Sequence, residues 1–156
     1  MIVTAEELAA IHAQALREYP HESCGLILTS GGERRVIPCR NIQEELHAQD
    51  PARHPRDART AYYIDPQDLL RIGRLEAEGF AVAVIYHSHI DAGAYFSETD
   101  RRQALFGEDP MYPDAAYIVS SVRGEASGPR VDDTAAFRWD PARRDFTPVE
   151  VDGRAV

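Results

Sequence analysis

The sequence predicts one α/β (α+β) domain over residues 1–156, in which helices and strands follow one another along the chain. Three observations predict this class. The chain opens with an amphipathic segment that has a clear helix start, an apolar strand-like run follows it, and a second apolar run lies near the middle. A chain of 156 residues has the length of a single domain and can bury a sizeable core.

The first helix is expected between Thr4 and Pro20. Thr4 is a suitable N-cap, Glu7 completes a capping box, and an apolar stripe begins with Leu8. Pro20 follows the expected end of the helix. The next two apolar runs lie on either side of a glycine-rich turn, so they predict a β-hairpin made of residues 24–30 and 34–42.

The remaining elements follow from caps and apolar runs. Asp65 and Pro66 mark a helix start, and Gly79 marks its end. The run after Gly79 is apolar on both faces, as in a central buried strand. The expected elements are a strand over 61–64, a helix over 66–79, a strand over 80–86, a helix over 97–106, a strand over 115–122 and a terminal hairpin from 135–140 and 145–151.

Residues 43–60 differ from the rest of the chain. The stretch is polar and interrupted by prolines, so we expect a loop without regular structure. Loops of this length inside compact domains are uncommon and often serve as lids or binding loops. The stretch is therefore either a binding loop, in which Arg53, Arg56 and Arg59 reach acidic groups on a partner, or a disordered insertion.

Charge and cysteine content narrow the class of protein. The net charge is -9, and all 17 basic residues are arginines without a basic run, which argues against a nucleic-acid partner. Cys24 and Cys39 are expected to be reduced thiols rather than a disulfide. The chain shows no signal peptide at its start and no apolar run that could span a membrane. We therefore expect a soluble, cytoplasmic protein.

Two histidines at the end of the central apolar run indicate a metal site. His87 and His89 are two residues apart in a strand, so their side chains project to the same face. Such a pair suits zinc, which needs a third ligand, and Asp100 can supply it. The alternative is a plain strand end followed by a Ser97–Asp100 capping box. Both interpretations can hold, because an ordered first helical turn can aim Asp100 at the histidines.

The pattern His87-Ser88-His89 followed by Ser97-x-x-Asp100 resembles the motif of the JAMM/MPN metalloprotease family. Upstream, Glu22 precedes a Cys-Gly-Leu run that is typical of short prokaryotic members. The resemblance covers most of the chain. It implies a curved mixed β-sheet flanked by helices, with the metal site at the end of a central strand. Ile90 departs from the family pattern, which usually has proline there, and this bears on the course of the 90–96 loop.

The resemblance also implies a role for each residue of the pattern. His87, His89 and Asp100 would bind zinc (Zn²⁺), with a water in the fourth position. Glu22 would be the general base, and Ser97 would hydrogen-bond the oxyanion of the tetrahedral intermediate. These parts match the chemistry of amide hydrolysis, which needs an activated water, a proton carrier and an anion stabiliser.

The other candidate residues receive structural interpretations. Cys24 shares the face of Glu22 in a strand and is expected to pack rather than to act as a nucleophile. Four histidines have no partner at ligand spacing and are assigned to the surface or to loops: His12, His21, His47 and His54.

The resemblance implies a substrate class as well. Relatives cut amide bonds that follow the C-terminal Gly-Gly of ubiquitin-like proteins, and in bacteria the implied partners are small sulfur carriers. The stretch 43–60 would then lie in the substrate groove. Two alternatives stay open: a non-catalytic MPN scaffold, although scaffolds usually lack the ligand residues, and a structural zinc domain, although that would more often use four protein ligands.

Overall fold

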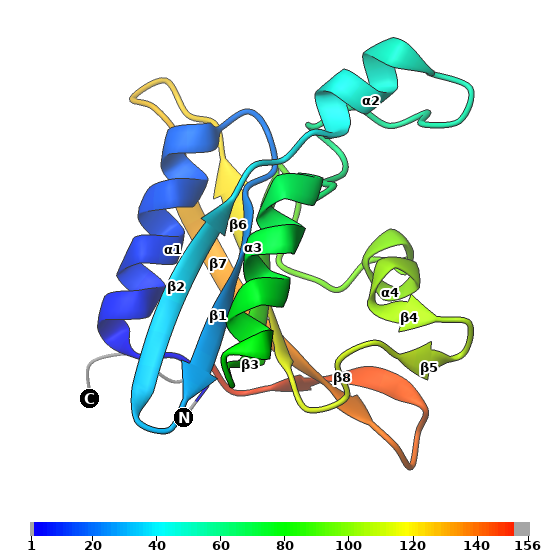
Figure 1. The fold of residues 1–156 in the computed structure, drawn as a ribbon. Coiled ribbons are helices and arrows are strands. Elements are labelled where there is room, and N and C mark those ends of the chain that lie inside the picture. The colour runs from blue at the N-terminus through cyan, green and yellow to red at the C-terminus, as the bar shows by residue number, and fades with distance from the viewer. Residues whose placement is uncertain (1, 152–156) are drawn as a thin grey trace.

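The structure, a computed structural model, describes residues 2–151. Its main sheet has the strand order β2-β1-β3-β6-β7-β8, and it is curved (Figure 1). Strands β3 and β6 run parallel, whereas the other neighbouring pairs are antiparallel, so the sheet is mixed as expected. The strands of this sheet are β1 (Cys24–Ser30), β2 (Glu33–Cys39), β3 (Ala81–Ile90), β6 (Ala116–Arg123), β7 (Arg130–Asp140) and β8 (Asp145–Val149).

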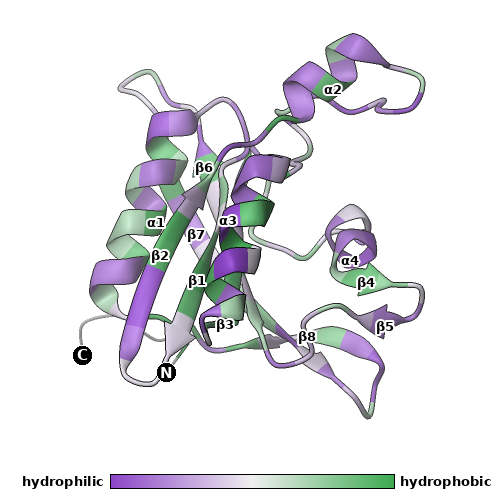
Figure 2. Cartoon of the chain, viewed as in Figure 1, coloured by the Kyte–Doolittle hydropathy of each residue, from purple (hydrophilic) through white to green (hydrophobic). Residues whose placement is uncertain are grey.

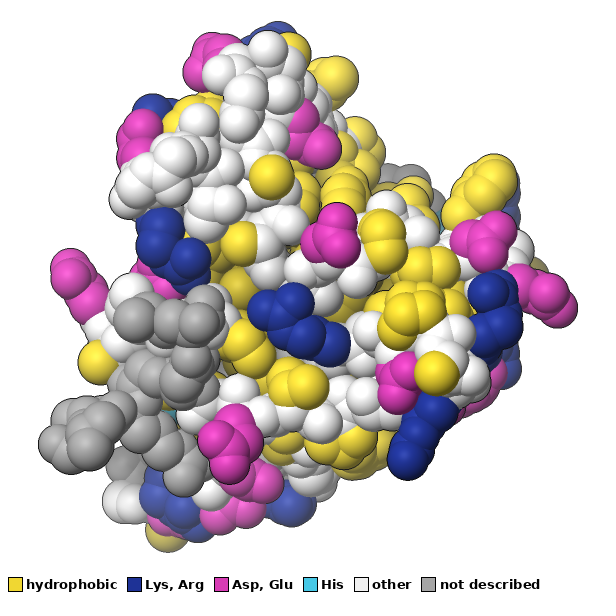
Figure 3. Space-filling model, turned by 90° about the horizontal axis from the view of Figure 1, so that it is seen from below, with side chains coloured by type: hydrophobic (Ala, Val, Ile, Leu, Met, Phe, Trp, Pro, Cys, Tyr) yellow, Lys and Arg dark blue, Asp and Glu magenta, His cyan; other side chains and the backbone are white. Residues whose placement is uncertain are grey.

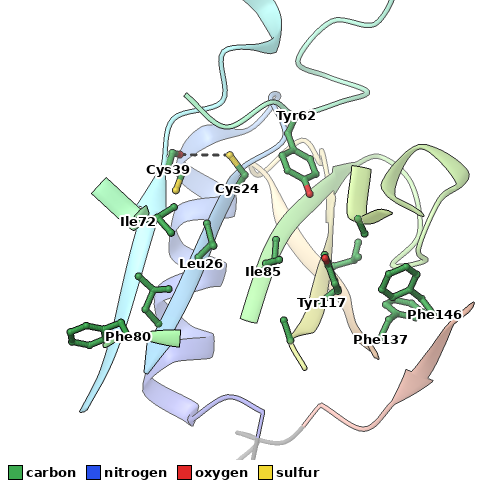
Figure 4. Packing of buried hydrophobic residues seen from close by; sticks show 14 residues of the cluster. Cys24, Leu26, Cys39, Tyr62, Ile72, Phe80, Ile85, Tyr117, Phe137 and Phe146 are labelled. Atoms are coloured by element: carbon green, nitrogen blue, oxygen red, sulfur yellow. Dashed lines mark hydrogen bonds between the residues drawn. The ribbon is translucent and has the colours of Figure 1, made fainter. Parts of the chain in front are cut away.

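Helices cover both faces of this sheet (Figure 1). Helix α1 (Ala5–Glu18) packs on one face, where Ile11 shares a buried apolar cluster with Ile27 and Val84. Helix α3 (Pro66–Ala77) packs on the other face, where Ile72 belongs to the cluster of Leu26 and its neighbours (Figure 4). Successive strand residues point to opposite faces, so one apolar strand supplies both layers of the core.

The predicted helix starts are confirmed. Thr4 caps α1 with a complete capping box, in which its hydroxyl accepts the N–H of Glu7 and its own N–H donates to the Glu7 carboxylate. Asp65 caps α3, with Pro66 in the first turn. Gly79 follows the end of α3 with a φ of 102°, a conformation that glycine adopts without strain.

The predicted hairpin of β1 and β2 is also confirmed, and its register places Cys24 opposite Cys39. Both side chains are buried free thiols, as expected. Burial raises the pKa of the Cys24 thiol far above its usual range and that of Cys39 to about 12. A thiol held in its protonated form is a poor nucleophile, which agrees with a packing role for Cys24.

The expectation of a structureless 43–60 loop is wrong, because the segment begins with helix α2 (Gln43–Gln49). Because α2 is mostly polar, its sequence has no apolar periodicity from which a helix could be predicted (Figure 2). The segment is held by hydrogen bonds: the Gln43 amide donates to the carbonyl of Arg56, and the N–H of Ala58 donates to the Glu44 carboxylate. These contacts argue against the disordered alternative.

The predicted strand over 61–64 is wrong as well. The stretch makes one isolated bridge, between Asn41 and Ile64. The Asn41 side chain replaces the missing ladder, because it donates to the carbonyl of Ala61 and accepts the N–H of Tyr63. A side chain that satisfies two backbone groups removes the need for a continuous pairing.

The third predicted helix is real but shorter than expected. Helix α4 (Glu98–Ala104) stops before Leu105, and the chain turns into a small hairpin of β4 (Leu105–Phe106) and β5 (Asp109–Pro110). Gly107 makes this turn with a φ of 66°. The predicted terminal hairpin is present as β7 and β8, although β7 begins five residues earlier, at position 130 instead of 135.

The surface carries charges of both signs. On the face seen from below, arginine and acidic side chains are interspersed with apolar ones, and neither sign dominates (Figure 3). Among residues 2–151, no helix combines the length and the apolar character needed to cross a membrane.

Candidate metal centre

The histidine pair lies at the buried end of β3, between β1 and β6. His87 has no exposed surface and His89 is 5% exposed. Their side chains share one face of the strand, and their Nε2 atoms lie 3.2 Å apart. Two imidazole nitrogens that face each other at this distance are arranged to share an ion or a proton.

Asp100 completes the group from the first turn of α4. One carboxylate oxygen lies 3.1 Å from Nε2 of His87 and the other lies 3.1 Å from Nε2 of His89. Ser97 and Asp100 also form a complete capping box, in which each residue's backbone N–H donates to the other's side chain. The two interpretations of this pair therefore hold together: the cap orders the turn, and the turn aims Asp100 at the histidines.

A second hydrogen bond fixes which nitrogen of His89 faces the group. Its Nδ1 lies 2.8 Å from the carbonyl oxygen of Gly93, which can only accept, so Nδ1 carries the hydrogen. In the neutral ring, Nε2 then presents a lone pair to Asp100 and His87. The His87 ring is instead held by stacking on Tyr62, with the ring centres 4.7 Å apart.

The donor atoms of this group fit a divalent metal. The three ligand atoms of His87, His89 and Asp100 lie within 4.8 Å of one another, and all three residues are buried. Two imidazole nitrogens and a carboxylate form a ligand set that suits zinc. Burial alone would raise the pKa of Asp100, but His87, His89 and the N–H of Ser97 outweigh it and hold that pKa well below its usual range. The carboxylate is therefore ionised and ready to bind a cation.

Glu22 lies just before β1, beside the histidine strand. Its N–H donates to the carbonyl of Ala58 at 2.8 Å, and its carbonyl accepts from the Asn41 amide at 2.9 Å. Within residues 2–151, no hydrogen bond reaches its carboxyl group. Burial, reinforced by the negative charge of Asp100, raises the pKa of Glu22 to about 9, while the charge of Arg56 acts in the opposite direction.

A buried pair of serines joins the two strand ends that carry these residues. The hydroxyl of Ser88 accepts the backbone N–H of Ser23 at 2.7 Å and lies 3.0 Å from its hydroxyl. The N–H of Ser88 in turn donates to the carbonyl of Ser23. Ser88, which alternates in the strand with the two histidines, and Asn41 thus position the backbone around Glu22, and the sequence analysis assigned a role to neither. A signal for either was lacking, because it depends on which strands become neighbours.

The predicted residues open on one cavity of about 240 Å³. Glu22, Ser97, His89 and Asp100 line it, whereas His87, which has no exposed surface, does not. Two arginines of the 43–60 segment, Arg56 and Arg59, also line the cavity, but Arg53 does not. The cavity is lined by Glu22, Arg56, Arg59, Thr60, His89, Ile90, Ala92, Tyr95, Ser97, Glu98, Thr99 and Asp100.

The departure at Ile90 leaves the histidine strand intact. β3 runs through Ile90, and the chain then turns at Asp91 with a φ of 51°. The Asp91 carboxylate holds this turn by accepting hydrogen bonds from Tyr19, Arg59 and the N–H of Gly124. The loop after Ile90 is therefore held by the hydrogen bonds of the Asp91 carboxylate, at a place where the family pattern has a proline.

The remaining histidines do not belong to the cluster of His87, His89 and Asp100. The expectation that His12 belongs to the surface or a loop is wrong, because it lies half-buried on α1 with its Nε2 2.8 Å from the Thr134 hydroxyl. His21 is exposed, and the ring of His47 contacts the carbonyl of His54 within the 43–60 segment. No further group of three or more candidate metal ligands occurs in the part of the chain that the structure describes.

Comparison with known proteins identifies the family to which a chain with this fold and site belongs. The profile of the family described as prokaryotic homologs of the JAB domain matches residues 4–139, so the chain belongs to this family. A curated relative from Mycobacterium tuberculosis, "CysO-cysteine peptidase", is 32% identical over 124 residues, which are 79% of this chain and 74% of the relative.

Two further similarities extend this comparison. The "Probable TtuB-protein conjugate cleaving protease" of Thermus thermophilus is 36% identical over 110 residues, covering 65% of this chain and 66% of that protein. A solution structure of a protein from Desulfitobacterium hafniense matches with a TM-score of 0.61 at 21% identity, covering 94% of this chain and 88% of that one. The last match supports the fold alone.

Proposed function

We propose that the protein is a zinc-dependent JAMM-type peptidase that hydrolyses the amide bond after the C-terminal Gly-Gly of a small ubiquitin-like sulfur carrier. One observation carries this proposal: the buried cluster of His87, His89 and Asp100 borders, through His89 and Asp100, the cavity that Glu22 and Ser97 also line. The names of the relatives support the substrate class, because one is a "CysO-cysteine peptidase" and the other a "Probable TtuB-protein conjugate cleaving protease".

His87, His89 and Asp100 are the proposed zinc ligands. When bound there, zinc would supply a water of lowered pKa and would polarise the carbonyl of the scissile bond. The low pKa of Asp100 supports this assignment because it keeps the carboxylate ionised. The Gly93 carbonyl supports it as well, because it keeps Nε2 of His89 free of hydrogen in the neutral ring.

Glu22 is the proposed general base and acid. Its raised pKa means that its carboxyl group readily holds a proton, which it can later give to the leaving amine. A cation in the neighbouring cluster would favour the ionised form and bring the pKa down toward the working range. A carboxyl group without hydrogen bonds to the surrounding chain is also free to turn between the attacking water and the departing nitrogen.

Ser97 is the proposed oxyanion stabiliser. Its hydroxyl oxygen accepts the N–H of Asp100 at 3.0 Å, so its own hydrogen stays available for donation into the cavity. A hydroxyl held in place by a helix cap costs little reorganisation when charge develops on the substrate oxygen. The capping box thus serves the chemistry as well as the helix.

The deciding experiment compares Glu22→Gln with wild type. The substrate is a small ubiquitin-like carrier whose Gly-Gly end is extended by one cysteine. We expect the variant to keep its zinc and its fold while turnover falls by about a hundredfold to ten-thousandfold, the usual effect of losing general acid–base help. Glu78→Gln, an exposed acid at the end of α3, is the control and should keep wild-type turnover.

The outcomes of this experiment distinguish the proposed peptidase from the alternative functions. Unchanged turnover in Glu22→Gln would remove Glu22 from the mechanism, and loss of zinc would make it a ligand. A zinc-loaded wild type that binds the carrier and never cleaves it would favour the scaffold. We further propose that the single domain 1–156 works in the cytoplasm, where free thiols such as Cys24 and Cys39 persist.

A further inference from the structure

The cavity that contains Glu22 has a cationic wall with no task in the hydrolysis described above. Arg56 and Arg59 both line it, in a chain whose net charge is -9. The carboxyl groups of Glu22, Glu98 and Asp100 also line the cavity, so the arginines give it one cationic side, and a local positive charge of this kind attracts an anionic group of a ligand.

The backbone that carries this wall is fixed directly against Glu22. The carbonyl of Arg56 accepts the side-chain amide of Gln43 at 2.8 Å. Two residues further on, the carbonyl of Ala58 accepts the N–H of Glu22 at 2.8 Å. The backbone around Arg56 is therefore held at two points, by α2 at Arg56 itself and by Glu22 at Ala58.

The two arginines differ in their partners. Arg59 donates to the Asp91 carboxylate at 2.7 Å, so its charge is compensated. The guanidinium of Arg56 makes one long hydrogen bond, 3.5 Å, to the carbonyl of Thr60, and it forms no ion pair within residues 2–151. Its charge is nevertheless felt at Glu22. The acid Glu98, also on the cavity wall, is largely exposed and has Arg102 at 3.7 Å.

We propose that Arg56 binds the free α-carboxylate of the amino acid that leaves, so that the enzyme removes a single C-terminal residue from its carrier. This inference rests on the proposed function and deepens it. In the reaction, the water oxygen bonds to the glycine carbonyl carbon, the C–N bond breaks, and the proton taken by Glu22 passes to the departing amine. In an amino acid, the carboxylate carbon lies about 2.5 Å from that amine nitrogen.

The carboxylate must therefore lie next to the group that protonates the amine, and Arg56 is the unpaired cation there. A guanidinium binds a carboxylate through two parallel hydrogen bonds, which gives specificity as well as affinity. A lysine in a protein conjugate leaves by its side-chain nitrogen, and its own carboxyl group is part of a peptide bond. Such a substrate offers Arg56 no charge. The proposal therefore describes an enzyme that removes one C-terminal residue, not one that cleaves a conjugate between two proteins.

The test uses three short peptides: one that ends in Gly-Gly-Cys with a free carboxylate, its C-terminal carboxamide, and a Gly-Gly linked to a lysine side chain. For the zinc-loaded wild type we expect kcat/KM to be about 10- to 100-fold higher for the acid than for the carboxamide, from the usual strength of hydrogen bonds to charged groups. In Arg56→Gln this preference should fall to about one, while the carboxamide rate changes little. Arg56→Lys should restore part of it.

Arg53→Gln is the matched control, because Arg53 belongs to the same segment and does not line the cavity. It should keep the wild-type preference. The inference is overturned if the wild type cuts acid and carboxamide equally, if Arg56→Gln keeps the preference, or if the lysine-linked peptide is the best of the three.

Binding separates this inference from the proposed function. In the Glu22→Gln background, calorimetry of the acid peptide and its carboxamide should show tighter binding of the acid, and the additional Arg56→Gln change should remove the difference. A difference that depends on Arg56 supports the carboxylate site even if wild type cleaves none of the peptides, which would sink only the peptidase proposal. Equal binding of the two peptides would sink the carboxylate site even if wild type cleaves both.

Discussion

Replacing Glu22 by glutamine should stabilise the metal-free protein, and the gain should grow with pH. The folded-state pKa of Glu22 is raised to about 9 from an ordinary value of 4.5, mainly by burial. Between these two values the unfolded chain ionises at this residue while the folded chain keeps its proton. Wild-type stability from this group is therefore complete below pH 4.5 and is lost progressively as the pH rises toward 9.

The magnitude follows from the linkage relation. Each pH unit in this window costs the wild type about 1.4 kcal/mol, so at pH 7 the loss is on the order of 3 kcal/mol. Glutamine resembles the neutral acid in size and cannot ionise, so the variant escapes this loss. The difference in unfolding free energy between Glu22→Gln and wild type should increase by about 1.4 kcal/mol per pH unit between pH 5 and pH 8.

Urea denaturation of both proteins with a chelator present, at several pH values, measures this difference. Glu78→Gln, at an exposed position, is the control, and its stability should run parallel to that of wild type. Added zinc should flatten the pH dependence of the difference between the two proteins, because a nearby cation favours the ionised form of Glu22 in the wild type. If the curves of Glu22→Gln and wild type stay parallel across pH 5 to 8 without metal, Glu22 is not a buried acid and the reasoning fails.

The remaining predictions concern single side chains. His89→Ala should lose most of its zinc by elemental analysis, whereas wild type keeps about one ion per chain; equal contents would remove His89 from the ligand set. Ser97→Ala should cost about 1 kcal/mol through the lost helix cap and lower kcat by about 10- to 1,000-fold, with Ser97→Thr recovering most of both. An unaltered kcat in Ser97→Ala would refute the oxyanion role. Gly25→Ala should lower stability by about 1–3 kcal/mol, because a Cβ there would clash with the Tyr86 hydroxyl and lie 2.7 Å from a backbone carbonyl oxygen. A thermal midpoint equal to that of wild type would show that the strand has room.

Local signals in the sequence predicted most of the secondary structure. The capping boxes at Thr4 and Ser97, the proline after Asp65 and the glycine after α3 each act within a few residues. The run before His87 is apolar on both faces because β3 lies between β1 and β6 under helices on both sides. These elements could be predicted because the residues that carry each signal are neighbours in the sequence.

The missed features depend on distant parts of the chain. α2 is polar, and its first residue is held by a hydrogen bond to Arg56 rather than by an apolar stripe. The stretch 61–64 looks like a strand, but Asn41 satisfies its backbone. The high pKa of Glu22 requires Asp100 and the buried surroundings that only the folded chain brings together. No window of neighbouring residues contains these contacts.

The two halves of the proposed catalytic cluster are joined by contacts of very different span along the chain. His89 and Asp100 are 11 residues apart, while the serine contact that brings Glu22 beside the histidine strand spans 65 residues. Closing a short loop costs less conformational entropy than closing a long one, and contacts between distant segments form slowly. Loop length alone therefore favours the proposed ion-binding half forming before the contact with β1. A chain in which only that half had formed would have the proposed metal ligands without the group that is proposed to move the proton. Under the proposed function, hydrolysis would need both halves, so binding of the ion by itself would not make an incompletely folded copy active.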